Sequence, residues 1–199
     1  MFNHFVKRSF MLILLLGGLG GCLSELDILP DNSKQEKLSC LVNGEPFAAT
    51  SGKGLLAMDF IRAEMQQTEN YFLLTVFGVN ILDSGEALAV GFRLGGSNPE
   101  SIQPGDTFTT WVAMEDMESN FEGAMGGVEK RKSPTSNETI YKAGSNHTGE
   151  MSLTVTTIDL AEKKISGTFR FTALDAEVDT LIEVSQGNFE NVQWKDIDT

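Results

Sequence analysis

In Ile165-Ser166-Gly167-Thr168-Phe169-Arg170-Phe171-Thr172-Ala173, every second side chain is apolar or small, and the side chains between them are polar or charged. The same period of two runs through 151–156, and the segment 159–164 between the two runs is polar enough to turn. Successive side chains of a β-strand point to opposite faces of the sheet. The two runs therefore predict an antiparallel hairpin with one buried face.

Similar patterns extend outward from this hairpin in both directions. Asn43-Gly44 follows an apolar run and predicts a tight hairpin turn. Leu181–Ser185 and Asn188–Trp194 predict either a closing strand pair or one bent strand. Further strands are expected at 71–77, 87–94 and 107–113. The predicted fold class is all-β: an antiparallel meander of about eight to ten strands that closes as a calycin-like barrel or, alternatively, packs as a β-sandwich.

The N-terminus has the features of a secretory signal peptide over residues 1–21. Lys7 and Arg8 precede a short apolar run, and glycines precede Cys22. Leu19-Gly20-Gly21-Cys22 resembles the bacterial lipobox, with Gly20 where Ala or Ser is usual. The resemblance implies a lipoprotein whose mature chain begins at Cys22, with acyl chains such as palmitate on that residue. Two or three acyl chains would hold the protein firmly in a membrane.

Residues 22–37 are polar and acidic around Pro30, which predicts a flexible tether between the acylated cysteine and a single all-β domain over 38–199. Glu25 and Asp27 lie close behind Cys22. They resemble the short acidic signal that sends lipoproteins of Bacteroidota to the outer face of the outer membrane. We therefore expect a lipid-anchored outer-membrane protein, and the sequence leaves open whether it faces the periplasm or the medium.

The charge of the mature chain argues against nucleic acid as a partner. Removing Lys7 and Arg8 with the signal leaves 13 basic against 28 acidic residues, a formal net charge of −15. Nucleic-acid binding requires a positive footprint. The segment at about 114–138 opens acidic and ends basic at Lys130-Arg131-Lys132. We expect a long loop there, and long loops on a β scaffold often carry binding function.

The sequence predicts neither an enzyme nor a metal or cofactor site. His147 is the one histidine that follows Cys22, and no Gly-x-Ser-x-Gly elbow is present to place a serine nucleophile. Zinc usually takes several His or Cys ligands. With Cys22 acylated, Cys40 has no cysteine partner, and we expect it to be a small buried apolar residue.

Three motifs carry a family resemblance: Val42-Asn43-Gly44-Glu45-Pro46-Phe47 near the start, the Gly-x-Phe-x-Phe strand at 165–173, and Val184-Ser185-Gln186-Gly187-Asn188-Phe189. Together with the lipobox they look like a family of uncharacterised Bacteroidota lipoproteins. Phe47 stands where Trp is frequent, and Gln186-Gly187-Asn188 replaces a plain Asn-Gly. The resemblance brings no known activity, so no functional residue is carried over.

Two functional hypotheses remain. The first is a non-enzymatic binding domain for a small molecule, glycan or protein, with its site in the predicted loop at about 114–138 or in the barrel interior. An empty apolar interior would favour a lipid ligand, and a filled one would argue against it. The alternative is a structural or accessory subunit of an envelope complex that takes no small ligand.

Overall fold

The computed structural model describes residues 35–51, 60–109, 111–113 and 121–197. Residues 34–199 form one compact unit. The predicted signal peptide, and the tether as far as residue 34, lie outside the described residues.

Strands make up almost all of the regular structure in the described residues. Two short 3-10 helices, η2 (Pro99–Ser101) and η3 (Ser145–His147), connect some of them. The strands are β1 (Lys37–Val42), β2 (Glu45–Thr50), β3 (Phe60–Gln67), β4 (Phe72–Ile81), β5 (Ala87–Gly96), β6 (Thr107–Phe108), β7 (Val112–Ala113), β8 (Phe121–Arg131), β9 (Thr139–Gly144), β10 (Met151–Asp159), β11 (Lys164–Asp175), β12 (Thr180–Gln193) and β13 (Lys195–Ile197).

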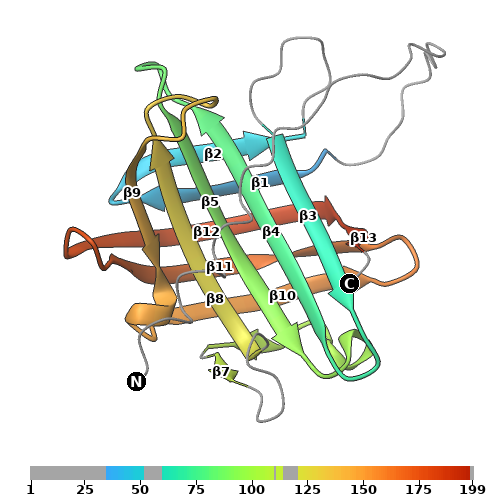
Figure 1. Cartoon of the computed structure of the whole chain (residues 1–199). Coiled ribbons are helices and arrows are strands. Elements are labelled where there is room, and N and C mark those ends of the chain that lie inside the picture. The colour runs from blue at the N-terminus through green and yellow to red at the C-terminus, as the bar shows by residue number, and fades with distance from the viewer. Residues whose placement is uncertain (1–34, 52–59, 110, 114–120, 198–199) are drawn as a thin grey trace, which may run out of the picture. The chain divides into compact units, whose positions relative to one another are not determined.

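The main strands lie side by side in the order β13-β3-β4-β5-β8-β9-β11-β12-β1-β2, and β10 pairs with β11 and with the short β6. Neighbours along this path are antiparallel except β13 and β3, which are parallel. Figure 1 shows two layers: β3, β4, β5, β8 and β9 cross β1, β2, β10, β11 and β12 at a steep angle. Among the described residues no pairing joins β2 to β13, so the sheet is not closed.

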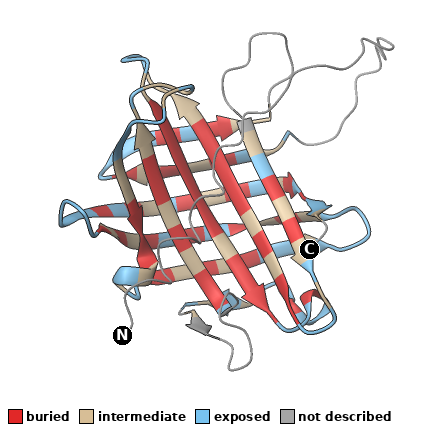
Figure 2. Cartoon of the chain, viewed as in Figure 1, coloured by how far each residue is buried: buried red, intermediate tan, exposed pale blue. Residues whose placement is uncertain are grey.

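The all-β prediction is confirmed, and the architecture combines features of its two forms. One sheet continues from layer to layer, as in a barrel, through the pairing of Leu174 on β11 with Gly144 on β9. The layers face each other across a core, as in a sandwich (Figure 2). The order departs from a simple meander, because the β1–β2 hairpin joins β12. That hairpin turns at Asn43-Gly44 as predicted, with Val42 opposite Glu45.

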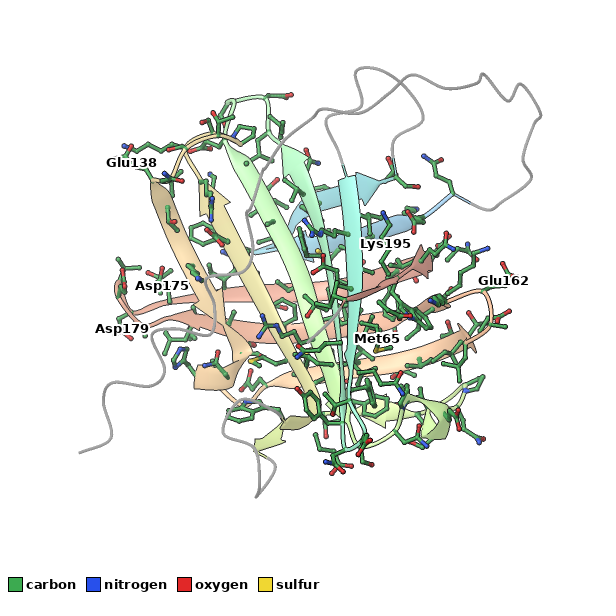
Figure 3. All side chains as sticks on the ribbon, turned by 45° about the vertical axis from the view of Figure 1, so that its right-hand side comes forward. Met65, Glu138, Glu162, Asp175, Asp179 and Lys195 are labelled. Carbon is green, nitrogen blue, oxygen red and sulfur yellow. The ribbon has the colours of Figure 1, made fainter. Side chains whose placement is uncertain are left out.

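Phenylalanine rings fill the space between the layers. Phe92 on β5 lies 4.8 Å from Phe189 on β12 and 5.6 Å from Phe169 on β11, measured between ring centroids. Phe171 lies 6.2 Å from Phe169. All four rings are buried, as are Met65 and most inward residues of β4 and β5. Charged side chains such as Glu138, Glu162 and Asp179 lie toward the outer ends of the strands (Figure 3).

The two Gly-x-Phe motifs lock into each other on neighbouring strands. Gly167 on β11 lies opposite Phe189 on β12, and Phe169 lies opposite Gly187. A Cβ on Gly167 would come within 2.6 Å of Phe189 Cζ, and one on Gly187 within 2.6 Å of Phe169 Cδ2. Each glycine thus leaves room for the aromatic ring of the opposite strand, a common use of glycine inside a sheet.

The predicted long loop at about 114–138 is wrong over 121–131, which form a strand, whereas 132–138 do form a loop. Strand β8 runs from Phe121 to Arg131 and pairs with β5 from Gly123 to Arg131. Residues 114–120 lie outside the described residues. Glycine has low strand propensity, and the three glycines between 121 and 131 are the reason why the sequence did not predict a strand there. Gly126 has a packing reason, because a Cβ there would come within 2.6 Å of Cε1 in the Phe171 ring of the other layer.

Candidate functional site

Cys40 and His147 are the two described residues whose chemistry the sequence raised, and one is buried and the other exposed. Cys40 on β1 is a free thiol with 5% of its surface exposed, which confirms its expected burial, and desolvation raises its pKa to about 12. His147 is exposed in η3, where its Nε2 lies 3.3 Å from Asn146 Nδ2. Cys22 lies outside the described part of the chain. Within the described ranges, no three His, Cys, Asp or Glu side chains are grouped to hold a metal ion.

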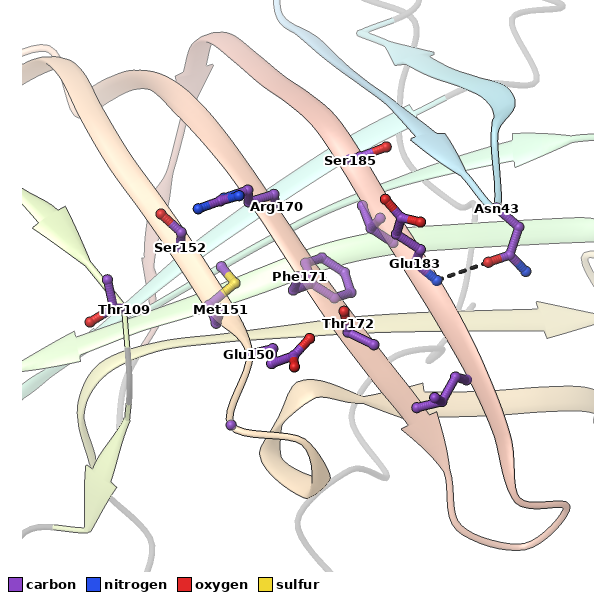
Figure 4. A pocket seen from close by; sticks show the side chains of 13 residues that line it. Asn43, Thr109, Glu150, Met151, Ser152, Arg170, Phe171, Thr172, Glu183 and Ser185 are labelled. Atoms are coloured by element: carbon purple, nitrogen blue, oxygen red, sulfur yellow. Dashed lines mark hydrogen bonds between the residues drawn. The ribbon is translucent and has the colours of Figure 1, made fainter.

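An open groove of about 690 Å³ crosses the outer face of β10, β11 and β12 (Figure 4). The alternation of β11 creates this face, because Phe169, Phe171 and Ala173 point into the core and Arg170 and Thr172 point outward. The remaining polar side chains of the groove come from β10, β12, the β1–β2 turn and the end of β6: Asn43, Thr109, Glu150, Ser152, Glu183 and Ser185.

Strand register arranges the groove side chains in two rows. In the first row, Ser152 on β10 lies opposite Arg170 on β11. In the second row, Thr172 lies opposite Glu183 on β12. The backbone N–H of Thr172 donates to the carbonyl of Glu150 at 3.1 Å, so Glu150 lies on the other side of Thr172. The two rows are one strand repeat apart, about 7 Å at 3.4 Å per residue.

A β-bulge faces Arg170. On β11 one residue separates Phe169 from Phe171, whereas on β12 two residues, Ser185 and Gln186, separate their partners. Gln186 has a φ of 52°. Bulges bend a strand and redirect side chains, and they are enriched next to functional sites. At this bulge the sheet presents Arg170 at the centre of the groove.

The turn at Asn43 holds the β12 side of the groove. Glu183 N donates to Asn43 Oδ1 at 2.8 Å, and Asn43 N donates to the carbonyl of Glu183 at 2.8 Å. This reciprocal pair is drawn in part in Figure 4. It fixes the backbone of Glu183 and leaves the carboxylate exposed.

Arg170 differs from the other arginines in the described part of the chain. Arg62 pairs with Glu64, Arg131 pairs with Glu129 with 2.6 Å between Nε and Oε1, and Arg93 also has an interaction partner. The exposed guanidinium of Arg170 has no hydrogen bond or ion pair with any described residue. A planar guanidinium offers two parallel N–H donors to a carboxylate or phosphate. The groove therefore presents a guanidinium that no described residue binds.

Sequence reasoning placed the binding function elsewhere, in the loop at about 114–138 or in the barrel interior. Residues 121–131 of that segment form strand β8, and the interior around Phe92, Phe169 and Phe189 is filled by rings. A lipid ligand in that part of the interior therefore has no support. The sequence pattern places Arg170 on the polar face of its strand and gives it no role in binding. The signal that could have marked it is one arginine among Ser and Thr on that face.

Comparison with known proteins adds a partial family match. Residues 118–193 match a family described as a domain of unknown function (DUF6252). The match includes strands β8 to β12, and so it includes the Gly-x-Phe motifs and Arg170. It is compatible with the predicted resemblance to an uncharacterised family. No curated protein and no solved structure matches the chain. In the described residues, no helix is both long and apolar enough to cross a membrane.

Proposed function

We propose that this chain is a lipid-anchored protein of the cell envelope that binds a small molecule, glycan or peptide segment in the groove over β10–β12 and catalyses no reaction on it. The observation that carries this proposal is that the guanidinium of Arg170 has no hydrogen bond or ion pair with any described residue. The chain is rich in acids, and two exposed carboxylates, Glu150 and Glu183, line the same groove. An arginine that has no partner among the described residues in such surroundings is available to a ligand.

The location follows from the sequence. Leu19-Gly20-Gly21-Cys22 supports acylation of Cys22, and the acids behind it support export to the outer membrane. The membrane is then a partner through the lipid, and the net charge of −15 on the mature chain argues against nucleic acid. Mass spectrometry of the N-terminal peptide tests the lipid. Protease treatment of intact cells tests whether the domain faces the medium.

The chemistry of the described residues supports binding without catalysis. The Cys40 thiol is buried, and its pKa of about 12 leaves almost no thiolate at neutral pH. The Nε2 of His147 faces the side-chain amide of its neighbour Asn146, which is neither a nucleophile nor an acid. We therefore assign the groove to recognition.

The test is a thermal-shift screen of the acylated protein in detergent micelles against carboxylates, sugars, phosphates and short peptides. A ligand at 100 times its dissociation constant should add about 2.7 kcal/mol to the free energy of unfolding. We expect Arg170→Gln to lose the shift. Arg62→Gln is the matched control, because it makes the same substitution on β3 in the other layer. The proposal is wrong if no class shifts the wild type, or if Arg170→Gln responds as the wild type does.

A second candidate function, an accessory subunit of an envelope complex, is favoured by the tip of the β11–β12 hairpin. Val178 and Leu181 are exposed there, with 59% and 60% of their surface accessible. An apolar side chain on the turn and another at the start of β12 suit a protein contact. Cross-linking in intact cells should then trap a partner with the wild type and lose it with Val178→Ser, which leaves the groove lining unchanged.

A further inference from the structure

We infer that the ligand of the groove is a short peptide, with its carboxylate held by Arg170 and its ammonium group held by Glu150 and Glu183. This inference rests on the proposed function, because it names the ligand class of the same groove.

The order of the charges follows from register. Arg170 belongs to the row that contains Ser152. The two glutamates flank Thr172 in the neighbouring row, Glu183 by strand pairing and Glu150 through the hydrogen bond to its carbonyl. Figure 4 shows the guanidinium beside Ser152 and the carboxylate of Glu150 beside Thr172. The backbone row that carries Arg170 and the row that carries the two glutamates thus lie about 7 Å apart along the strands, the repeat of two residues of extended chain.

The signs disfavour ligands that carry several charges of one sign. An acidic polymer would meet Arg170, but it would also meet two exposed carboxylates and a mature chain with a net charge of −15. A purely cationic ligand would be attracted by the glutamates and repelled by Arg170. A ligand with one carboxylate and one ammonium group satisfies both rows.

The groups between the charges suit peptide units. The hydroxyls of Thr109, Ser152, Thr172 and Ser185 line the groove, and each can donate or accept a hydrogen bond. A peptide carries one donor and one acceptor per residue and needs such partners when it leaves water. A volume of about 690 Å³ lies within the range of sites that bind small ligands.

The experiment is an NMR titration of the acylated protein, in which chemical shifts report dissociation constants for four probes. Triglycine carries both charges, N-acetyl-triglycine lacks the ammonium group, triglycine amide lacks the carboxylate, and galacturonate carries a carboxylate on a sugar without an ammonium group. We expect triglycine to bind about tenfold more tightly than either capped peptide, which corresponds to one charge-assisted hydrogen bond lost.

Variants assign each charge to its partner. Arg170→Gln should abolish the preference for triglycine over its amide and keep the preference over the acetylated form. Glu150→Gln/Glu183→Gln should do the reverse, and Arg62→Gln should change neither. The peptide inference is overturned if galacturonate binds in an Arg170-dependent way and triglycine does not, an outcome that leaves the proposed function standing. If none of the four probes binds, the peptide inference is overturned and the wider ligand screen decides the proposed function. If every probe binds Arg170→Gln as it binds the wild type, both are overturned.

Discussion

A methyl group added at Gly126 should destabilise the protein, because it would enter the ring of Phe171. Gly126 lies on β8 in one layer and Phe171 on β11 in the other, and the three atoms nearest to an added Cβ all belong to that ring, with Cε1 at 2.6 Å. Phe171 is 3% exposed and packs against Phe169, so it has little room to move. Overpacking of this kind costs about 1–3 kcal/mol. Replacing glycine by alanine in the unfolded chain returns about 0.4–1 kcal/mol.

We therefore expect Gly126→Ala to lower the free energy of unfolding by about 1–2 kcal/mol, and the melting temperature by roughly 2–8 °C for a domain of this size. Urea unfolding followed by circular dichroism measures the change, with the m-value as a check on two-state behaviour. Gly96→Ala is the matched control on β5. Its Cβ would lie 3.0 Å from Phe72 Cε1, so its cost should be smaller.

A double-mutant cycle isolates the ring contact. Phe171→Leu alone should cost roughly 1–2 kcal/mol through the cavity that it leaves. The leucine side chain frees the space that Gly126→Ala needs, so the double variant should be more stable than the sum of the single effects predicts, by about 1 kcal/mol. Additive effects, or a Gly126→Ala variant as stable as the wild type, would refute the argument that this glycine exists to accommodate the ring.

Three further predictions concern buried polar groups. Cys40 should resist alkylation in the folded protein and react once urea unfolds it, as mass spectrometry would show. Its pKa is raised from the ordinary value of 9.0 to about 12, so the unfolded chain loses the proton first; the free energy of unfolding should fall above about pH 9 by up to 1.4 kcal/mol per pH unit, and Cys40→Ala should lack this component. Asp175→Ala should cost about 2–5 kcal/mol in urea unfolding, because the buried carboxylate accepts from the backbone N–H groups of Lys142 and Glu177, each at 2.9 Å. Ser145→Ala should cost about 1–3 kcal/mol by the same assay, because its fully buried hydroxyl accepts from a β8 amide at 2.9 Å, and Ser145→Thr should be milder if the hydroxyl is what matters.

Strands with strict alternation could be predicted from sequence, because one face of each is buried. This holds for β10 and β11, where buried and exposed residues follow the sequence pattern. The Asn43-Gly44 turn was equally visible, because both residues adopt positive φ, as a tight hairpin turn requires.

Strand β8 escaped prediction because its inward positions are small. At Gly126, for example, the ring of Phe171 occupies the space that a side chain would need, and Phe171 lies more than 40 positions later in the sequence. A strand whose residues are chosen for the space that a distant side chain needs carries little local signal. The groove escaped for a related reason: its charges come from three strands, and only the register of those strands shows which residues share a row.

The bulge in β12 connects the core to the groove. Val184 and Gly187 are both buried although three positions separate them, a spacing that strict alternation forbids. Without the extra residue, either Val184 would face solvent or Gly187 would leave its place opposite Phe169. The bulge therefore keeps Val184 and Gly187 facing the core. It also places two residues of β12, Ser185 and Gln186, opposite the single residue Arg170 of β11. A second bulge on β12 supplies a comparison, because there Ser166 of β11 accepts a hydrogen bond from Asn191 N at 2.9 Å. The two bulges on this strand thus meet β11 differently: at one, Ser166 accepts a backbone hydrogen bond, and at the other, Arg170 has no partner among the described residues.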